Sequence, residues 1–170
     1  MLQNQKLKAI IEKLSKEHDS FYLYDQKTVI ESVQRLKKNF PKVEFLYSMK
    51  CNPNDNILKT VFDKGFHADA ASLGEVKKAG ELGLSKEQIY YSAPGKMNQD
   101  IEGALENSII IADSIEELYR IQQIADSRKQ IVEIGIRVNP NFTMEGDTCQ
   151  FNKFGIDEDQ AITTSQIEGN

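Results

Sequence analysis

A lysine at the end of an apolar segment is the residue of this chain best suited to covalent chemistry. Lys50 follows residues 43–49, whose pattern is typical of a buried strand. In a β/α barrel, the carboxyl ends of the strands form the face that carries the active site. Apolar and aromatic neighbours there should desolvate Lys50, which favours a neutral amine able to attack a carbonyl carbon. The alternative is a lysine whose methylenes pack on the rim while its ammonium reaches water.

The elements that would position Lys50 recur along the chain. Short apolar segments rich in β-formers begin at intervals of 23, 23, 20 and 22 residues, at Val43, Phe66, Ile89, Ile109 and Ile131. The stretches between them have helical periodicity, for example at Ile57, Leu58, Val61 and Phe62. Five strands that alternate with helices indicate a parallel sheet with right-handed crossovers, in either an open doubly wound sheet or part of a β/α barrel.

Helix boundaries support this order of elements. Ser72 with Glu75, and Ser114 with Glu117, have the spacing of capping boxes at helix starts. Gly65 and Gly83 stand where helices should end.

Before the first repeat, residues 1–42 predict a helix through Leu7 and Leu14, a short strand over 21–24, and a second helix. Asp25 should cap that second helix and Pro41 should close it. After Arg137, a polar loop over 139–152 and a helix that begins near Asp157 are expected. We therefore divide the chain into this preamble and a β/α part over 43–170.

Composition excludes several classes of function. Lys and Arg number 21 against 26 Asp and Glu, a net charge of −5 without a basic cluster, so neither nucleic acid nor an anionic membrane is an expected partner. The N-terminal residues lack the apolar core of a signal peptide, which favours a cytoplasmic protein. Cys51 and Cys149 form no Cys-x-x-Cys pair, so neither a disulfide framework nor a metal site is expected. The Gly-x-Gly-x-x-Gly motif of dinucleotide-binding folds is missing after the first strand. A phosphate-binding Gly-Lys-Ser/Thr loop is missing too, because Gly95-Lys96 is followed by Met97.

Six short motifs, in order, resemble those of the fold-type III pyridoxal-phosphate-dependent decarboxylases, a family that includes diaminopimelate, ornithine, lysine and arginine decarboxylases. The first resembles the family's opening Pro-Phe-Tyr-Val-Tyr-Asp, although Ser20 stands where proline is usual, and the second resembles the family's Tyr-Ala-Val-Lys-Cys-Asn. The motifs are Phe21-Tyr22-Leu23-Tyr24-Asp25, Tyr47-Ser48-Met49-Lys50-Cys51-Asn52, Asp69-Ala70-Ala71-Ser72-Leu73-Gly74-Glu75, Tyr91-Ser92-Ala93-Pro94-Gly95-Lys96, Arg137-Val138-Asn139-Pro140 and Lys153-Phe154-Gly155.

The resemblance implies an α/β fold, namely the N-terminal five of eight units of an alanine racemase-like (β/α)8 TIM barrel. It also implies decarboxylation of a basic or diamino acid, with Lys50 holding pyridoxal 5'-phosphate as an internal aldimine and the cofactor ring acting as an electron sink. A homodimer is implied for the full-length protein. The phosphate loop and the second domain of the family are not among these residues, so we expect this chain alone to be inactive.

The resemblance also implies roles for other residues. Asp69 would orient the ammonium of Lys50 and tune its proton affinity, the alternative being a helix cap. Arg137 would join the hydrogen-bond network near the cofactor, the alternative being a surface ion pair. Ser72 and Lys153 are weaker candidates for substrate contact, because Ser72 fits a capping box and Lys153 lies in a loop. His67 should face the same side as Asp69, although an ordinary partly buried histidine is the simpler interpretation.

Two other functions fit the same residues. An amino-acid racemase would use the same barrel and lysine, and product chirality against release of CO2 separates it from a decarboxylase. A non-catalytic pyridoxal-phosphate-binding barrel protein would keep the lysine without turnover, but such proteins lack the 21–25 and 153–155 motifs.

Overall fold

Five parallel strands in sequential order form the sheet that carries the strand ends named above. In this computed structural model, which describes residues 2–140 and 153–165, the order is β1-β2-β3-β4-β5. The strands are β1 (Leu46–Ser48), β2 (His67–Ala70), β3 (Ile89–Tyr91), β4 (Ile109–Ala112) and β5 (Ile134–Ile136). The α/β fold with five consecutive parallel strands is confirmed, and the open doubly wound alternative, whose strand order reverses, is not supported.

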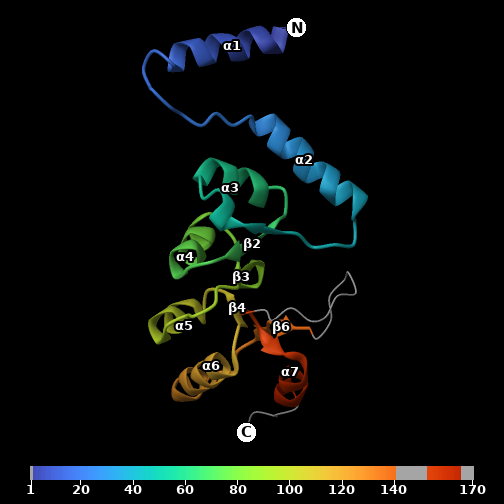
Figure 1. The fold of residues 1–170 in the computed structure, drawn as a ribbon, viewed down its shortest axis with the longest axis vertical. Coiled ribbons are helices and arrows are strands. Elements are labelled where there is room, and N and C mark those ends of the chain that lie inside the picture. The colour runs from blue at the N-terminus through green and yellow to red at the C-terminus, as the bar shows by residue number, and fades with distance from the viewer. Residues whose placement is uncertain (1, 141–152, 166–170) are drawn as a thin grey trace.

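A helix follows each of the first four strands and lies on one side of the sheet (Figure 1). They are α3 (Asp55–Phe62), α4 (Leu73–Glu81), α5 (Asn98–Ala104) and α6 (Ile115–Arg128), and a 3₁₀ turn, η2 (Lys86–Gln88), precedes β3. Ser72 and Ser114 cap α4 and α6, each accepting a hydrogen bond from the amide of the residue three positions later at 3.2 Å. Gly65 and Gly83 have φ of 78° and 97°, left-handed values that only glycine adopts without strain. The predicted starts and stops are thus confirmed.

The two faces of the sheet differ in burial. Alternate residues of β2 to β4, such as Ala68, Ala70, Tyr91 and Ile110, are buried against the helices and form the main core. Side chains on the opposite face, among them His67 and Asp69, are only partly buried. Because side chains alternate along a strand, the second face corresponds to the inside of a barrel, and it displays the polar strand-end residues.

Two predicted strand starts were three residues too early. The segments predicted from Val43 and Ile131 become strands only at Leu46 and Ile134, where pairing begins with His67 and Ile110. A strand needs a partner for its backbone groups as well as apolar side chains, and Ile131 is fully exposed.

The preamble contains α1 (Leu2–Leu14) and α2 (Gln26–Asn39). The side chain of Asp25 caps α2 by accepting from the amide of Lys27 at 3.0 Å, as predicted. Val33 of α2 packs on Ile57 and Val61 of α3 and on Phe66, so α2 rests on the barrel part. Residues 21–24 do not form the predicted strand, because no strand in the described part of the chain pairs with them. The domain boundary after residue 42 stays a prediction.

The last described elements are β6 (Val138–Asn139), β7 (Ile156–Asp157) and α7 (Glu158–Ser165). β6 and β7 pair in parallel, and α7 begins where a helix was expected. Most of the predicted polar loop, residues 141–152, lies outside the described residues. Over residues 2–140 and 153–165, none of the helices is both long and apolar enough to cross a membrane.

Candidate active site at the carboxyl ends of the strands

Lys50 lies in a single 3₁₀ turn, η1 (Met49–Cys51), directly after β1. Its neighbours hold this turn in place: Met49 is completely buried in the core, and the Tyr47 hydroxyl lies 3.5 Å from the Asn52 carbonyl oxygen. Burial raises the pKa of Tyr47, so its phenol is neutral and can donate to that carbonyl. The fold therefore fixes the backbone of Lys50 at the end of a strand.

The side chain of Lys50 is exposed, so the expected desolvation was wrong for the chain as described. The reason is that β1 is an edge strand here and pairs only with β2. An exposed primary amine at a fixed position is open to an aldehyde that arrives from solvent.

Asp69 lies on the neighbouring strand at the same edge of the sheet. It is in register with Ser48, the last residue of β1, and the Ser92 hydroxyl donates a hydrogen bond to its Oδ1. Among the ion pairs of the described residues none joins Asp69 to Lys50, so the predicted contact is not formed here and the role of Asp69 stays a prediction. The capping alternative for Asp69 is not supported, since Ser72 caps α4.

Ser92 was not predicted as a site residue from the sequence. It follows β3, and its amide continues the sheet by donating to the Ala70 carbonyl at 3.1 Å. Its place directly after an apolar segment is the same signal that pointed to Lys50.

His67 lies two residues before Asp69 and is partly buried, as expected. Its ring is parallel to that of Tyr90 at 6.4 Å, and its Nδ1 is buried without a hydrogen-bond partner in the described chain. The inner face of the sheet thus carries an unsatisfied nitrogen beside the candidate carboxylate.

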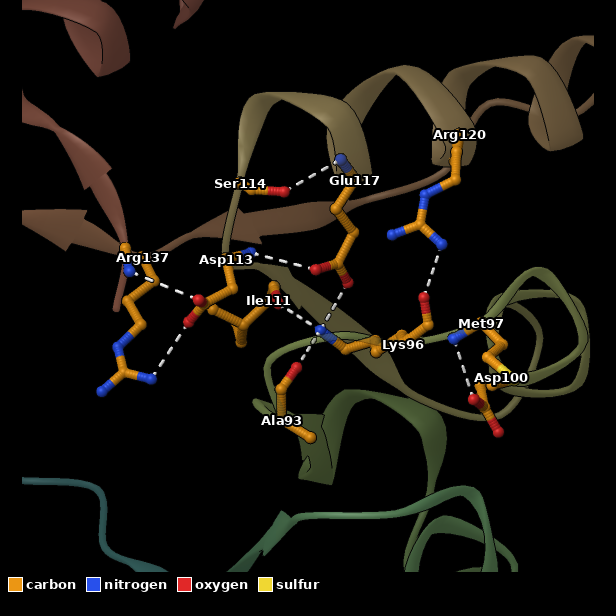
Figure 2. A network of polar contacts seen from close by, with 11 residues as sticks. Ala93, Lys96, Met97, Asp100, Ile111, Asp113, Ser114, Glu117, Arg120 and Arg137 are labelled. Carbon is orange, nitrogen blue, oxygen red and sulfur yellow. Dashed lines mark hydrogen bonds and ion pairs between the residues drawn. The ribbon is translucent and has the colours of Figure 1, made fainter. Parts of the chain in front are cut away.

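Arg137 directly follows β5 and takes part in a half-buried ion pair (Figure 2). Its Nη1 lies 3.0 Å from Oδ1 of Asp113, and its guanidinium carbon lies 4.6 Å from the centre of the Phe154 ring. The ion-pair alternative is therefore what the structure displays, and contact with a cofactor stays a prediction for Arg137. Asp113, the residue after β4, was not identified from the sequence.

The two weaker candidates are clearly placed. The Ser72 oxygen accepts from the Glu75 amide and Glu75 accepts from the Ala71 amide at 2.7 Å, so this pair works as a helix cap. Lys153 is exposed, with its ammonium 5.0 Å from the centre of the Phe154 ring. It lines an open hollow of about 380 Å³ with Ser114 and Gly155, and its contact with substrate stays a prediction.

Gly155 joins the last two motifs into one unit. Its amide donates to Oδ2 of Asp113 at 3.3 Å, and the next amide, of Ile156, donates to the Arg137 carbonyl at 2.8 Å. Its φ is 86°, and a Cβ built on it would lie 3.0 Å from the carbonyl oxygen of Arg137 and from the amide nitrogen of Asn139. Only glycine fits this crossing of two backbones.

Gly155→Ala should therefore lower the free energy of unfolding by about 1 to 3 kcal/mol, because it forces a side chain into a left-handed conformation against backbone atoms. The measurement is denaturant unfolding of the complete protein. Gly80→Ala in α4 is the control: a Cβ there meets nothing within 4 Å, so this change should stabilise by about 0.5 to 1 kcal/mol. Equal effects of the two substitutions would contradict the close crossing at Gly155.

Comparison with known proteins shows which families and structures this chain is similar to. The pyridoxal binding domain of the pyridoxal-dependent decarboxylases matches residues 26–168. The chain is 32% identical over 145 residues to L-glutamyl-[BtrI acyl-carrier protein] decarboxylase of Niallia circulans, covering 81% of this chain and 34% of that protein. It is 33% identical over 151 residues to diaminopimelate decarboxylase of Helicobacter pylori, covering 84% and 37% respectively.

Among solved structures, a variant of the Helicobacter pylori diaminopimelate decarboxylase complexed with L-lysine superimposes with a TM-score of 0.78 at 32% identity. The match covers 90% of this chain and 41% of that one. The chain thus spans 34 to 41% of the length of these relatives.

Proposed function

The chain belongs to the pyridoxal-dependent decarboxylases, and from that membership we propose that the protein containing it removes the carboxylate of a basic or diamino acid with pyridoxal phosphate. The observation that carries the proposal is Lys50, an exposed amine at the end of the first barrel strand in a matched pyridoxal binding domain. Substrates of the diaminopimelate, ornithine, lysine or arginine type are proposed from the relatives.

The residues of the described chain fit pyridoxal phosphate. Lys50 offers an accessible amine for the cofactor's aldehyde, and the Asp69 carboxylate lies on the next strand at the same edge of the sheet. On the same face as Asp69, His67 has a buried Nδ1 without a hydrogen-bond partner in the described chain. Lys50 would hold the cofactor, with Asp69 and Arg137 near it. Once bound, pyridoxal phosphate supplies an electron-withdrawing ring that stabilises negative charge at the α-carbon of the amino acid.

The chain's own residues would act on position and protons. The Ser92 hydroxyl holds the Asp69 carboxylate, which in turn would attract and orient the ammonium form of Lys50. Lys50, when its amine is free, can donate or accept a proton at Nζ. Whether a carboxylate or a proton leaves depends on which α-carbon bond is aligned with the cofactor ring.

The test uses the complete protein with pyridoxal phosphate. We expect visible absorbance from the lysine-bound cofactor, and CO2 release from at least one of meso-diaminopimelate, ornithine, lysine and arginine. Absorbance with racemised amino acid and without CO2 would establish the racemase alternative instead. Absorbance without any turnover would favour the non-catalytic binding protein, and an absence of absorbance would contradict all three functions.

We also propose that the complete protein is a cytoplasmic homodimer. The free, exposed thiol of Cys51 suits a reducing compartment, and the family resemblance implies the dimer. Cell fractionation and sedimentation analysis test the two parts separately. Recovery of the protein in a secreted fraction, or as a monomer at micromolar concentration, would contradict them.

A further inference from the structure

Lys96 carries a buried charge that the proposed reaction does not use. Its side chain is 0% exposed, and its Nζ donates to Oε1 of Glu117 at 2.6 Å and to the carbonyls of Ala93 and Ile111 at 2.7 Å each (Figure 2). An ammonium has three protons, so every one of them has an acceptor. Lys96 thereby ties the loop after β3, the end of β4 and the first turn of α6 to one point.

Glu117 is the anion that balances this ammonium. Burial lowers the pKa of Lys96, while its hydrogen bond to Glu117 opposes that shift. The Tyr91 ring, 5.1 Å from Nζ, is neutral, because burial raises the pKa of Tyr91 to about 12. Buried ion pairs often contribute less stability than apolar residues of the same volume, so such a pair calls for a reason beyond stability.

The contacts of Glu117 lead from this pair to the candidate site. Its Oε1 holds Lys96, and its Oε2 accepts from the amide of Asp113 at 3.4 Å. The Asp113 carboxylate, in a residue only 8% exposed, then binds Nη1 of Arg137 at 3.0 Å and the amide of Gly155 at 3.3 Å. Figure 2 shows Asp113 between Glu117 and Arg137. An unbroken series of contacts therefore runs from the loop after β3 to the segment after β5.

We propose that Lys96 and Glu117 are positioning residues: the buried pair fixes Asp113, and Asp113 holds Arg137 and residues 153–155 at the carboxyl ends of the strands. The part played in cofactor binding rests on the proposed function. The mechanical part, from Lys96 to Gly155, does not.

Hydrogen exchange in the cofactor-free complete protein tests the mechanical part. Lys96→Met should make the peptide spanning residues 153–157 exchange about tenfold faster, because Asp113 then loses its fixed position as acceptor for the Gly155 amide. Asp113→Asn should have a similar effect. If Lys96 acts through Asp113, adding Lys96→Met to Asp113→Asn should change the rate by less than about twofold.

Control variants distinguish a positioning role of Lys96 from a general loss of protein stability. Lys59→Met removes an exposed ion pair with Asp63 on α3 and should leave exchange at 153–157 unchanged. If Lys96→Met does not fold, the charge-free double variant Lys96→Met with Glu117→Leu replaces it. The same increase in the exchange rate at residues 153–157 is then expected. Exchange within twofold of wild type in a folded variant with a lowered melting temperature would overturn the proposal, since the pair would then be only a core contact.

The cofactor gives the second measurement. In wild-type background, Lys96→Met should weaken binding of pyridoxal phosphate several-fold by absorbance titration, and in an Arg137→Ala background it should not. Equal weakening in both backgrounds would overturn the link to Arg137. Faster exchange at 153–157 in a protein that binds no pyridoxal phosphate would support the positioning series and contradict only the proposed function.

Discussion

Lys50→Ala should abolish the visible absorbance of pyridoxal phosphate bound to the complete protein and lower decarboxylation by at least about a thousandfold. The reason is that the substitution removes the exposed amine at the end of β1 that would hold the cofactor's aldehyde. Both effects can be followed in one preparation, by spectrophotometric titration with the cofactor and by CO2 release.

The matched variant is Lys50→Arg. It keeps a positive charge at the same place, but a guanidinium stays protonated and does not attack an aldehyde, so the loss should equal that of Lys50→Ala. Lys42→Ala, an exposed lysine before β1, should retain absorbance and rate. Because the side chain of Lys50 makes no hydrogen bond or ion pair in the described chain, circular dichroism should be unchanged in both Lys50 variants. Full absorbance and activity in Lys50→Ala would contradict the assignment.

The sheet could be predicted because short apolar segments recur at a nearly constant interval with helical patterns between them. Some helix boundaries were also visible in the sequence, since Ser72 and Ser114 cap α4 and α6, and Gly65 and Gly83 follow α3 and α4. Residues 21–24 have a strand-like sequence of the same quality, yet form no strand. A strand forms only when another segment of the chain pairs with it, and the pattern of one segment does not show whether such a partner exists.

The candidate site could be predicted only in part, and for a similar reason. Asp69 lies inside β2 and was predicted only from the family resemblance. Lys50 and Arg137 each follow an apolar segment, and parallel strands bring such positions to one edge. Asp113 gives the same signal directly after β4. Lys96 has no such signal, because it lies in a turn and its burial depends on Glu117, 21 residues later. The same dependence explains the exposure of Lys50, whose surroundings are set by strands beside β1 and not by its own segment.

Glu117→Gln should lower the stability of the complete protein far more than the same change at Glu75. Both glutamates occupy the third position after a capping serine, and both accept from a backbone amide just before the helix, at 3.4 Å for Glu117 and 2.7 Å for Glu75. Only Glu117 also holds a buried ammonium, that of Lys96 at 2.6 Å. The two sites therefore share a local motif and differ in one buried charge.

Removing one partner of a buried ion pair leaves the other charge unpaired, which costs about 3 to 5 kcal/mol. Glu117→Gln should therefore lower the free energy of unfolding by that amount, whereas Glu75→Gln, which keeps an amide oxygen for the Ala71 amide, should cost less than about 1 kcal/mol. Urea unfolding of both variants measures the difference. Restoring a charge-free core in the double variant Glu117→Leu with Lys96→Met should recover most of the loss, since apolar pairs of similar volume replace buried ion pairs well. Equal small losses at Glu117 and Glu75 would mean that the Lys96 ammonium is solvated on substitution, and that the buried pair does not hold the β3, β4 and α6 ends together.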